Sequence, residues 1–84
     1  MVKRGRNVAL ARLLEESGYS ETQFASRVNR LASEAGVPAR YEQPSVSQWI
    51  SGTVPRPAVR HLIAEVLSRR LGRPVTVAGV GFPA

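Results

Sequence analysis

Several residue types are missing from this chain or nearly so, and each absence excludes a class of function. The sequence has no cysteine, no aspartate and one histidine, His61. Without cysteine the chain can build neither a disulfide framework nor a thiolate metal site. His61 falls off the apolar stripe of a predicted helix and has no partner for nucleophilic catalysis. We therefore expect no enzymatic activity, no metal site and no cofactor.

Long apolar runs are also missing. The stretch that follows the basic N-terminus is interrupted by Arg12 and Glu15, so it is not typical of a signal peptide. No segment approaches the length of about 20 apolar residues that a membrane span requires. The sequence therefore predicts a cytoplasmic protein that has no membrane partner.

Basic charge is what the sequence has in excess. Its 84 residues, enough for one small domain, carry eleven arginines, one lysine and six glutamates, a formal net charge of +6. The excess is concentrated in residues 1–12, which contain no acid, and in residues 53–73, which contain one glutamate. Such a surplus on a small domain is expected of a protein that binds a polyanion.

Apolar spacing predicts an all-α fold of four to five helices and no convincing strand. The clearest helix start is the capping box that Ser20 and Gln23 form. The helices are expected over residues 7–17, 20–36, 43–51 and 57–71. They form one domain over 7–72, which lies between a basic N-terminal arm (1–6) and an apolar C-terminal tail or linker to a missing domain (73–84).

Residues 43–52 carry the most informative pattern. Val46, Trp49 and Ile50 follow helical spacing and can pack inward. The other face offers uncharged donors and acceptors, from Gln43, Ser45, Ser47 and Gln48. Side chains of this kind read base edges in the major groove of DNA. On this segment alone, an ordinary amphipathic helix with a solvated polar face is the alternative.

These segments carry a family resemblance over about residues 6–72. Its motifs are Tyr-Ser-Glu-Thr-Gln-Phe-Ala at 19–25, Ser-Val-Ser-Gln-Trp-Ile-Ser-Gly at 45–52, and Pro57 with an apolar helix that ends in Leu-Gly at 71–72. The chain resembles the phage-repressor-like (Cro/C1, XRE-type) helix-turn-helix domain, and most of all the N-terminal domains of actinobacterial transcriptional regulators. The resemblance implies a lambda-repressor-like fold, whose second helix crosses the phosphate backbone and whose third enters the major groove.

Three features depart from the family pattern. The connection between the second and third helices is extended, so the turn is not the usual tight one. Pro44 stands where the family often has a hydrogen-bonding residue, which removes one usual base contact. Glu21 stands where an amide often touches phosphate, and DNA would repel its carboxylate. The resemblance therefore shifts the expected backbone contacts toward Thr22 and Gln23.

The candidate site combines these positions. Base contacts are expected from Gln43, Ser45, Ser47 and Gln48. Phosphate contacts are expected from Thr22, Gln23, Arg40, Tyr41, Ser51, Thr53, Arg56, Arg4 and Arg6. Packing of Tyr41 under the connection and solvation of Arg40 stay open as alternatives. Trp49 is expected in the core. Arg69 and Arg70 lie in the last turn of a predicted helix, where cations interact favourably with the helix dipole, so their presence does not require a ligand.

The sequence thus predicts sequence-specific binding of double-stranded DNA by part of a nucleoid-associated transcriptional regulator. The alternative is a protein-interaction adaptor, for example an antitoxin-like module on the same scaffold. Structured RNA is a weaker third option, because single-strand readers usually present stacking aromatics. The free chain is expected to be mainly monomeric, and two copies are expected to meet on repeated half-sites in DNA.

Overall fold

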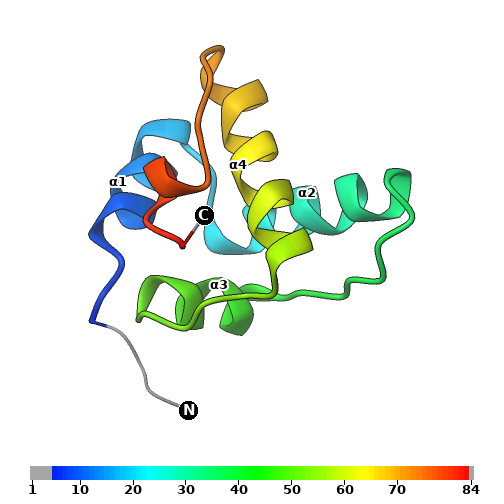
Figure 1. Ribbon diagram of the computed structural model, residues 1–84, viewed down its shortest axis with the longest axis horizontal. Coiled ribbons are helices and arrows are strands. Elements are labelled where there is room, and N and C mark those ends of the chain that lie inside the picture. Colours follow the sequence, from blue (N-terminus) through cyan, green and yellow to red (C-terminus); the bar gives the residue numbers. More distant parts are fainter. Residues whose placement is uncertain (1–4, 84) are drawn as a thin grey trace.

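Residues 5–83 are described by a computed structural model, which contains four α-helices, one short 3-10 helix and no strand in this range (Figure 1). The elements are α1 (Val8–Ser17), α2 (Glu21–Glu34), α3 (Gln43–Ile50), α4 (Pro57–Leu71) and η1 (Ala78–Val80). The predicted all-α class is confirmed, and α4 has the bounds that the sequence predicts.

Local capping determines where the first two helices begin. Asn7 precedes α1, and its Oδ1 accepts a hydrogen bond from the backbone N–H of Leu10 at 3.0 Å. At the start of α2, Ser20 Oγ accepts from Gln23 N at 3.1 Å, and Gln23 Oε1 accepts from Ser20 N at 2.9 Å. These bonds satisfy N–H groups that have no partner within a helix, so the predicted capping box is confirmed.

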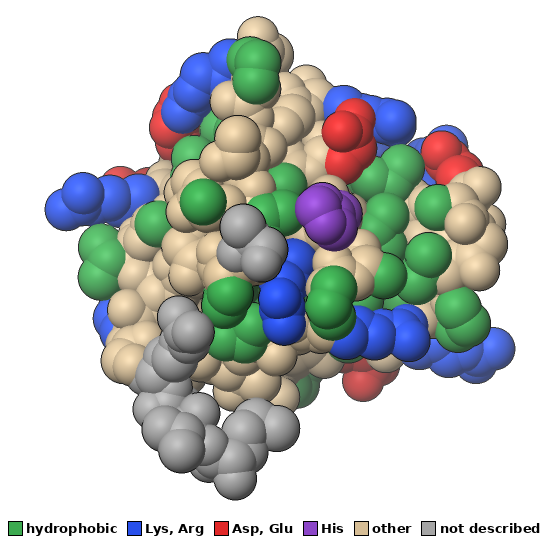
Figure 2. Space-filling view, in the orientation of Figure 1, with side chains coloured by type: hydrophobic (Ala, Val, Ile, Leu, Met, Phe, Trp, Pro, Cys, Tyr) green, Lys and Arg blue, Asp and Glu red, His purple; other side chains and the backbone are tan. Residues whose placement is uncertain are grey.

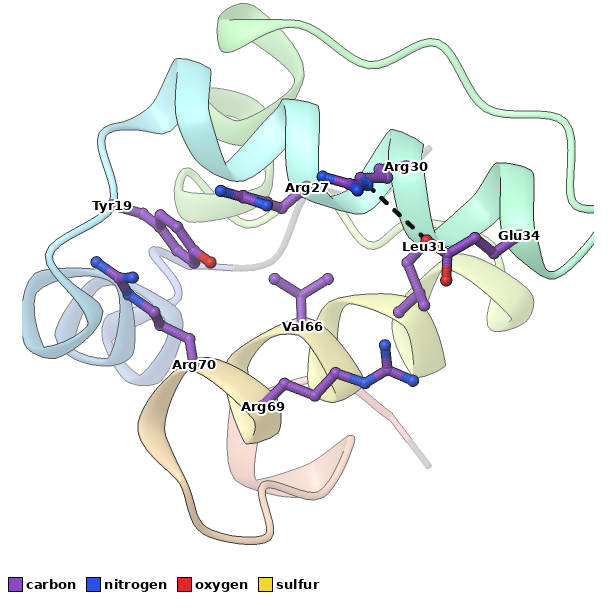
Figure 3. A pocket seen from close by; sticks show the side chains of 8 residues that line it. All are labelled: Tyr19, Arg27, Arg30, Leu31, Glu34, Val66, Arg69 and Arg70. Carbon is purple, nitrogen blue, oxygen red and sulfur yellow. Dashed lines mark ion pairs between the residues drawn. The ribbon is translucent and has the colours of Figure 1, made fainter.

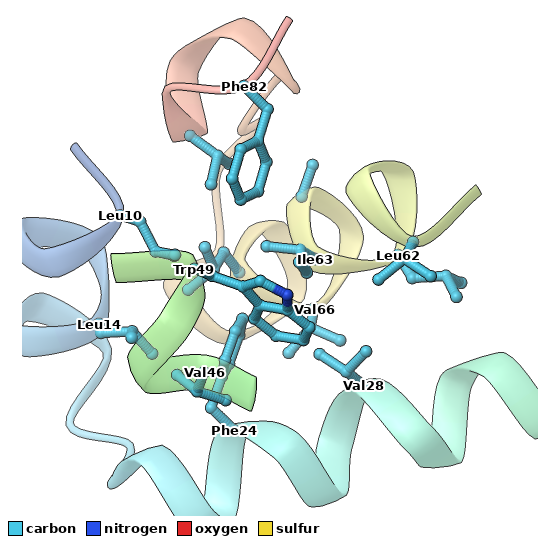
Figure 4. Packing of buried hydrophobic residues seen from close by; sticks show 14 of the residues in the cluster. Leu10, Leu14, Phe24, Val28, Val46, Trp49, Leu62, Ile63, Val66 and Phe82 are labelled. Atoms are coloured by element: carbon cyan, nitrogen blue, oxygen red, sulfur yellow. The ribbon is translucent and has the colours of Figure 1, made fainter. Parts of the chain in front are cut away.

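The helices enclose one apolar core. Helix α2 packs against both α3 and α4, and α1 packs against α3, α4 and η1. Trp49 of α3 lies among side chains from these helices in Figure 4, and its ring meets that of Phe24 edge to face, with 6.4 Å between centroids. Because Trp49 is only 3% exposed, its predicted place in the core is confirmed.

The C-terminal segment folds back onto the helices. Residues 73–84 were expected to form a tail or linker, yet Val77, Val80 and Phe82 are buried in the same core as the helices. Element η1 packs on α1, and the backbone N–H of Val75 donates to Ser68 Oγ of α4 at 2.8 Å. As far as Phe82, the segment is therefore part of the folded unit, because its apolar side chains find partners on helices distant in sequence.

The connection between α2 and α3, residues 35–42, is extended and non-helical (Figure 1). Asn29 of α2 fixes its end, since its amide donates to Tyr41 O at 2.7 Å and its carbonyl accepts from Tyr41 N at 2.8 Å. The half-buried Tyr41 ring lies edge to face against Trp49, with 4.9 Å between centroids. Of the two arrangements that the sequence left open for Tyr41, the structure therefore has the packed one.

Candidate functional site

Helix α3 has a buried face and an outward face. Val46 and Trp49 point into the core and fix how the helix is rotated. At about 100° per residue, the side opposite this pair carries Pro44, Ser47, Gln48 and Ser51. Gln43 and Ser45 fall on the two flanks of that side. The four predicted base-contact residues thus divide, with Ser47 and Gln48 on the outward face and the other two at its edges.

Gln43 is tied to the preceding helix. Its Nε2 donates to Glu21 Oε1 at 2.6 Å, which joins the first turn of α3 to the first turn of α2. The amide of Gln43 is therefore oriented by Glu21, and its carbonyl oxygen remains as an acceptor. Glu21, whose carboxylate was expected to be repelled by DNA, thus positions the side chain of a predicted base contact.

Ser45 in the first turn of α3 and Ser51 directly after the helix use their hydroxyl groups at its two ends. Ser45 Oγ accepts from Glu42 N at 3.5 Å, as part of a box that caps the start of α3. Ser51 Oγ donates to Ser47 O at 3.0 Å at the other end. Gln48, which is exposed between these ends, supplies an amide on the outward face.

The start of α2 lies beside α3 and contributes two predicted phosphate contacts. Thr22 is exposed there. Gln23 is exposed as well, but its Oε1 belongs to the capping box, so only its amide N–H groups point to solvent. Thr22 and Gln23 are therefore accessible, and both can donate a hydrogen bond to an anion.

Arginines stand on both sides of α3 in sequence. Arg40 is exposed in the connection before α3. Arg56, the residue before α4, is exposed, and one of its guanidinium nitrogens donates to the carbonyl of Pro38. Thr53 is half-buried, and its backbone N–H donates to Gln48 O at 2.9 Å. Arg56 therefore links the segment after α3 to the connection before it, which sequence reasoning did not anticipate.

The N-terminal segment meets the end of α3. The backbone N–H of Asn7 donates to Ile50 O at 2.7 Å, and Asn7 Nδ2 donates to Val80 O at 2.9 Å. Arg6 is exposed next to this junction. Arg4, the other predicted contact of the basic arm, lies outside the described residues. No local sequence signal marks this junction, because its partners are distant along the chain.

Basic side chains are distributed over several edges of the face shown in Figure 2, with acidic side chains beside some of them. In residues 5–83 the ion pairs are Arg30–Glu34, Arg69–Glu65 and Arg73–Glu16, and none involves α3 or the segments that flank it. Hydrogen bonds from Arg73 hold the pKa of the Glu16 carboxyl below its ordinary value, and the same contact raises the pKa of Arg73. The charges beside α3 are therefore not neutralised by the ion pairs of the described chain.

Two other kinds of site can be considered for the described part of the chain. No group of three or more acidic or histidine side chains there could hold a metal ion. No described helix has both the length and the apolar character needed to cross a membrane.

Comparison with known proteins gives a family. The sequence model of the SP15 N-terminal domain matches residues 10–83. The chain belongs to this family. No curated protein and no solved structure matches the chain. The SP15 N-terminal domain match begins within α1 and ends at residue 83, so it includes most of α1, all of α2, α3 and α4, and the returning C-terminal segment.

Proposed function

We propose that this SP15 N-terminal domain is a sequence-specific binder of double-stranded DNA that inserts α3 into the major groove, as part of a transcriptional regulator. The outward face of α3 is the observation that supports it best. That face carries hydroxyl and amide groups without formal charge, while burial of Val46 and Trp49 fixes its orientation. An exposed helix of this kind fits the groove and can exchange hydrogen bonds with base edges.

The cations near α3 add electrostatic support. Arg6 stands beside the end of α3, and Arg40 and Arg56 stand in the segments before and after it. Cations placed at the rim of a reading helix meet phosphates on both sides of a groove and set the register of the protein on the duplex.

The arrangement that we propose is lambda-repressor-like, with a lengthened connection between α2 and α3. In it, α2 lies across the phosphate backbone while α3 enters the groove. Packing of α2 on α3 and the hydrogen bond between Glu21 and Gln43 support this, since they hold the first turns of the two helices together. Exposed Thr22 at the same end of α2 is then the nearest donor for a phosphate.

The test is a selection of bound duplexes from fragmented genomic DNA, followed by sequencing, with the 84-residue chain and three variants. Gln48→Ala should relax the preference at one base position by about 1–3 kcal/mol. Arg56→Ala should weaken all duplexes alike. His61→Ala, a change of similar size at an exposed position of α4, should leave both properties unaltered.

Salt dependence provides an independent measurement. About four to six phosphate contacts per protomer give a slope of about −4 to −5 in a plot of log affinity against log salt concentration. Affinity that does not change between low and physiological salt would contradict the proposal. So would the absence of any enriched sequence together with recovery of a protein partner, which would favour the adaptor alternative.

A further inference from the structure

A second basic surface lies on the other flank of α2. Glu21 and Asn29 of α2 make hydrogen bonds toward α3 and Tyr41, on one side of the helix. Arg27 and Leu31 lie on the opposite flank, where they line a groove of about 530 Å³ between α2 and the C-terminal half of α4 (Figure 3). The groove therefore faces away from the surface that we propose for DNA.

The groove combines positive charge with apolar surface. Four arginines line it against one glutamate: Arg27, Arg30, Arg69 and Arg70 against Glu34. Leu31, Val66 and Tyr19 provide apolar area between these charges (Figure 3). Arg30 and Arg69 have acidic neighbours on their own helices, whereas Arg27 takes part in none of the ion pairs in residues 5–83. The lining thus has an uncompensated positive charge next to an apolar floor.

At one end of the groove, Arg70 and Tyr19 contact each other and their neighbours. The Arg70 guanidinium lies 4.5 Å from the centroid of the Tyr19 ring, and its Nε donates to Ser17 O at 2.9 Å. The Tyr19 ring also contacts Phe24, with 6.3 Å between centroids. Proteins bind single-stranded nucleic acids by stacking bases on aromatic rings. Because Arg70 covers one face of the Tyr19 ring and Phe24 packs against it, Tyr19 is poorly placed for such stacking.

These observations distinguish two kinds of polyanion. A phosphate backbone needs positive charge but gains nothing from the apolar lining, where Leu31 is half-buried and Val66 lies at the buried floor. A protein segment with glutamates or aspartates around an apolar side chain satisfies both, since its acids meet the arginines and its apolar group covers the floor. A volume of about 530 Å³ is large enough for a few side chains.

We propose that the groove between α2 and α4 is a docking site for an acidic, apolar-bearing segment of a partner protein. Arg27 and Arg30 would receive its carboxylates, and Leu31 and Val66 its apolar side chain. The proposal does not rest on DNA binding, because the groove shares no residue with α3.

The test uses the 84-residue chain and a short fluorescein-labelled synthetic helix that carries glutamates on either side of two leucines at i, i+4 spacing. Two control peptides replace the glutamates with glutamine or the leucines with alanine. Anisotropy should show binding that weakens by about tenfold with either control peptide, because both charge and apolar burial contribute. In an NMR titration, the resonances of Leu31, Val66 and Tyr19 should shift the most.

Two charge-reversal variants locate the site on the protein. Arg27→Glu should reduce affinity for the acidic peptide by about tenfold, because it places a repulsive charge in the groove. Arg12→Glu makes the same change in net charge on the exposed surface of α1 and should reduce it much less. Both variants should bind duplex DNA with equal affinity, which separates this proposal from the proposed function.

Three results would overturn the proposal. The first is the same peptide affinity in both variants. The second is a peptide without leucines that binds as well as the original, which would indicate a simple anion site. The third is loss of duplex binding in Arg27→Glu but not in Arg12→Glu, which would assign the groove to nucleic acid.

Discussion

Trp49 contacts two other aromatic rings, Phe24 at 6.4 Å and Tyr41 at 4.9 Å between centroids, and it stands on the helix proposed to read DNA. Because it is 3% exposed, its role is packing. Trp49→Ala should lower the free energy of unfolding by about 3–5 kcal/mol, as measured by chemical denaturation. DNA binding should fall only in proportion to the unfolded fraction. A Trp49→Ala protein that melts at the wild-type temperature and cannot bind would instead place the indole in the interface.

Asn7 makes hydrogen bonds to three elements, α1, α3 and η1. Its side chain lies close to Gly81, which has no Cβ to clash with it. Gly81 has φ 88°, and a Cβ there would lie 2.3 Å from Asn7 Oδ1. Gly81→Ala should therefore displace Asn7 from its bonds to Leu10, Ile50 and Val80. Gly36→Ala is the matched control, because Gly36 has φ 72° and nothing within 4 Å of its Cβ position.

Each alanine should cost about 1–2 kcal/mol for the left-handed backbone alone. Gly81→Ala should cost at least about 1 kcal/mol more, since part-buried hydrogen bonds of the Asn7 side chain are lost as well. Urea denaturation of the two variants measures the difference. Equal destabilisation would show that Asn7 can move aside without loss.

At the scale of the elements, helix positions were predictable because their signals are local. Ser20 and Gln23 mark the start of α2, and Pro57 and Gly72 lie at the two ends of α4. Each of these boundaries is therefore determined by residues within a few positions of it. The outward face of α3 was predictable for the same reason, since it depends only on helical period and on which residues are apolar.

Contacts between distant segments could not be predicted. The hydrogen bond from Asn7 to Val80 spans 73 positions, and nothing near either residue specifies the other. The hydrogen bond between Gln43 and Glu21 could not be predicted either. Because of this bond, Glu21 positions the Gln43 side chain, although its carboxylate was expected to be repelled by DNA. The packing of the C-terminal segment could not be predicted in detail, because its short apolar run has no helical period and Phe82 is buried among helices distant in sequence.

An ion pair between α1 and the segment after α4 gives a pH dependence. Arg73 donates to both carboxylate oxygens of Glu16, and the pKa of Glu16 is lowered in the folded protein. A lowered folded pKa stabilises the protein above the ordinary carboxyl pKa of about 4.3. This contribution is lost as the pH falls through the folded pKa. Both side chains are about half exposed, so the effect should be small.

Denaturation midpoints of the wild type and Glu16→Gln, measured between about pH 7 and 3, should converge at the acid end. The wild type should be the more stable at neutral pH. Glu15→Gln, at the neighbouring exposed position of α1, should keep the wild-type difference between neutral and acid pH. An acid dependence of Glu16→Gln identical to that of the wild type would contradict a role for the pair.

At the scale of the whole molecule, α2 separates two surfaces. One flank holds α3 and its hydroxyl and amide groups, and the other lines the arginine groove with α4. A domain built in this way can bind two partners at once without steric conflict on α2. The proposed DNA contact and the proposed peptide contact are then independent, and their affinities should be additive in free energy.

The free chain should be monomeric, because its apolar side chains are used within one copy. In the described part of the chain, Val8 is the only large apolar residue classed as exposed, at 48%. The C-terminal segment, which could have docked onto a second copy, covers its own helices instead. Specific dimers usually bury far more apolar area than one valine offers.

Light scattering at micromolar concentration should therefore give the mass of one chain, and Val8→Ser should not change it. On DNA, two copies should occupy paired half-sites with modest cooperativity, because the described surface provides no strong contact between them. Titration against duplexes with one and with two half-sites measures this. A stable dimer without DNA that persists in Val8→Ser would refute the monomer prediction and require an interface made of polar residues. The first candidate for such an interface would be the arginine groove of one copy against the glutamates of a second copy.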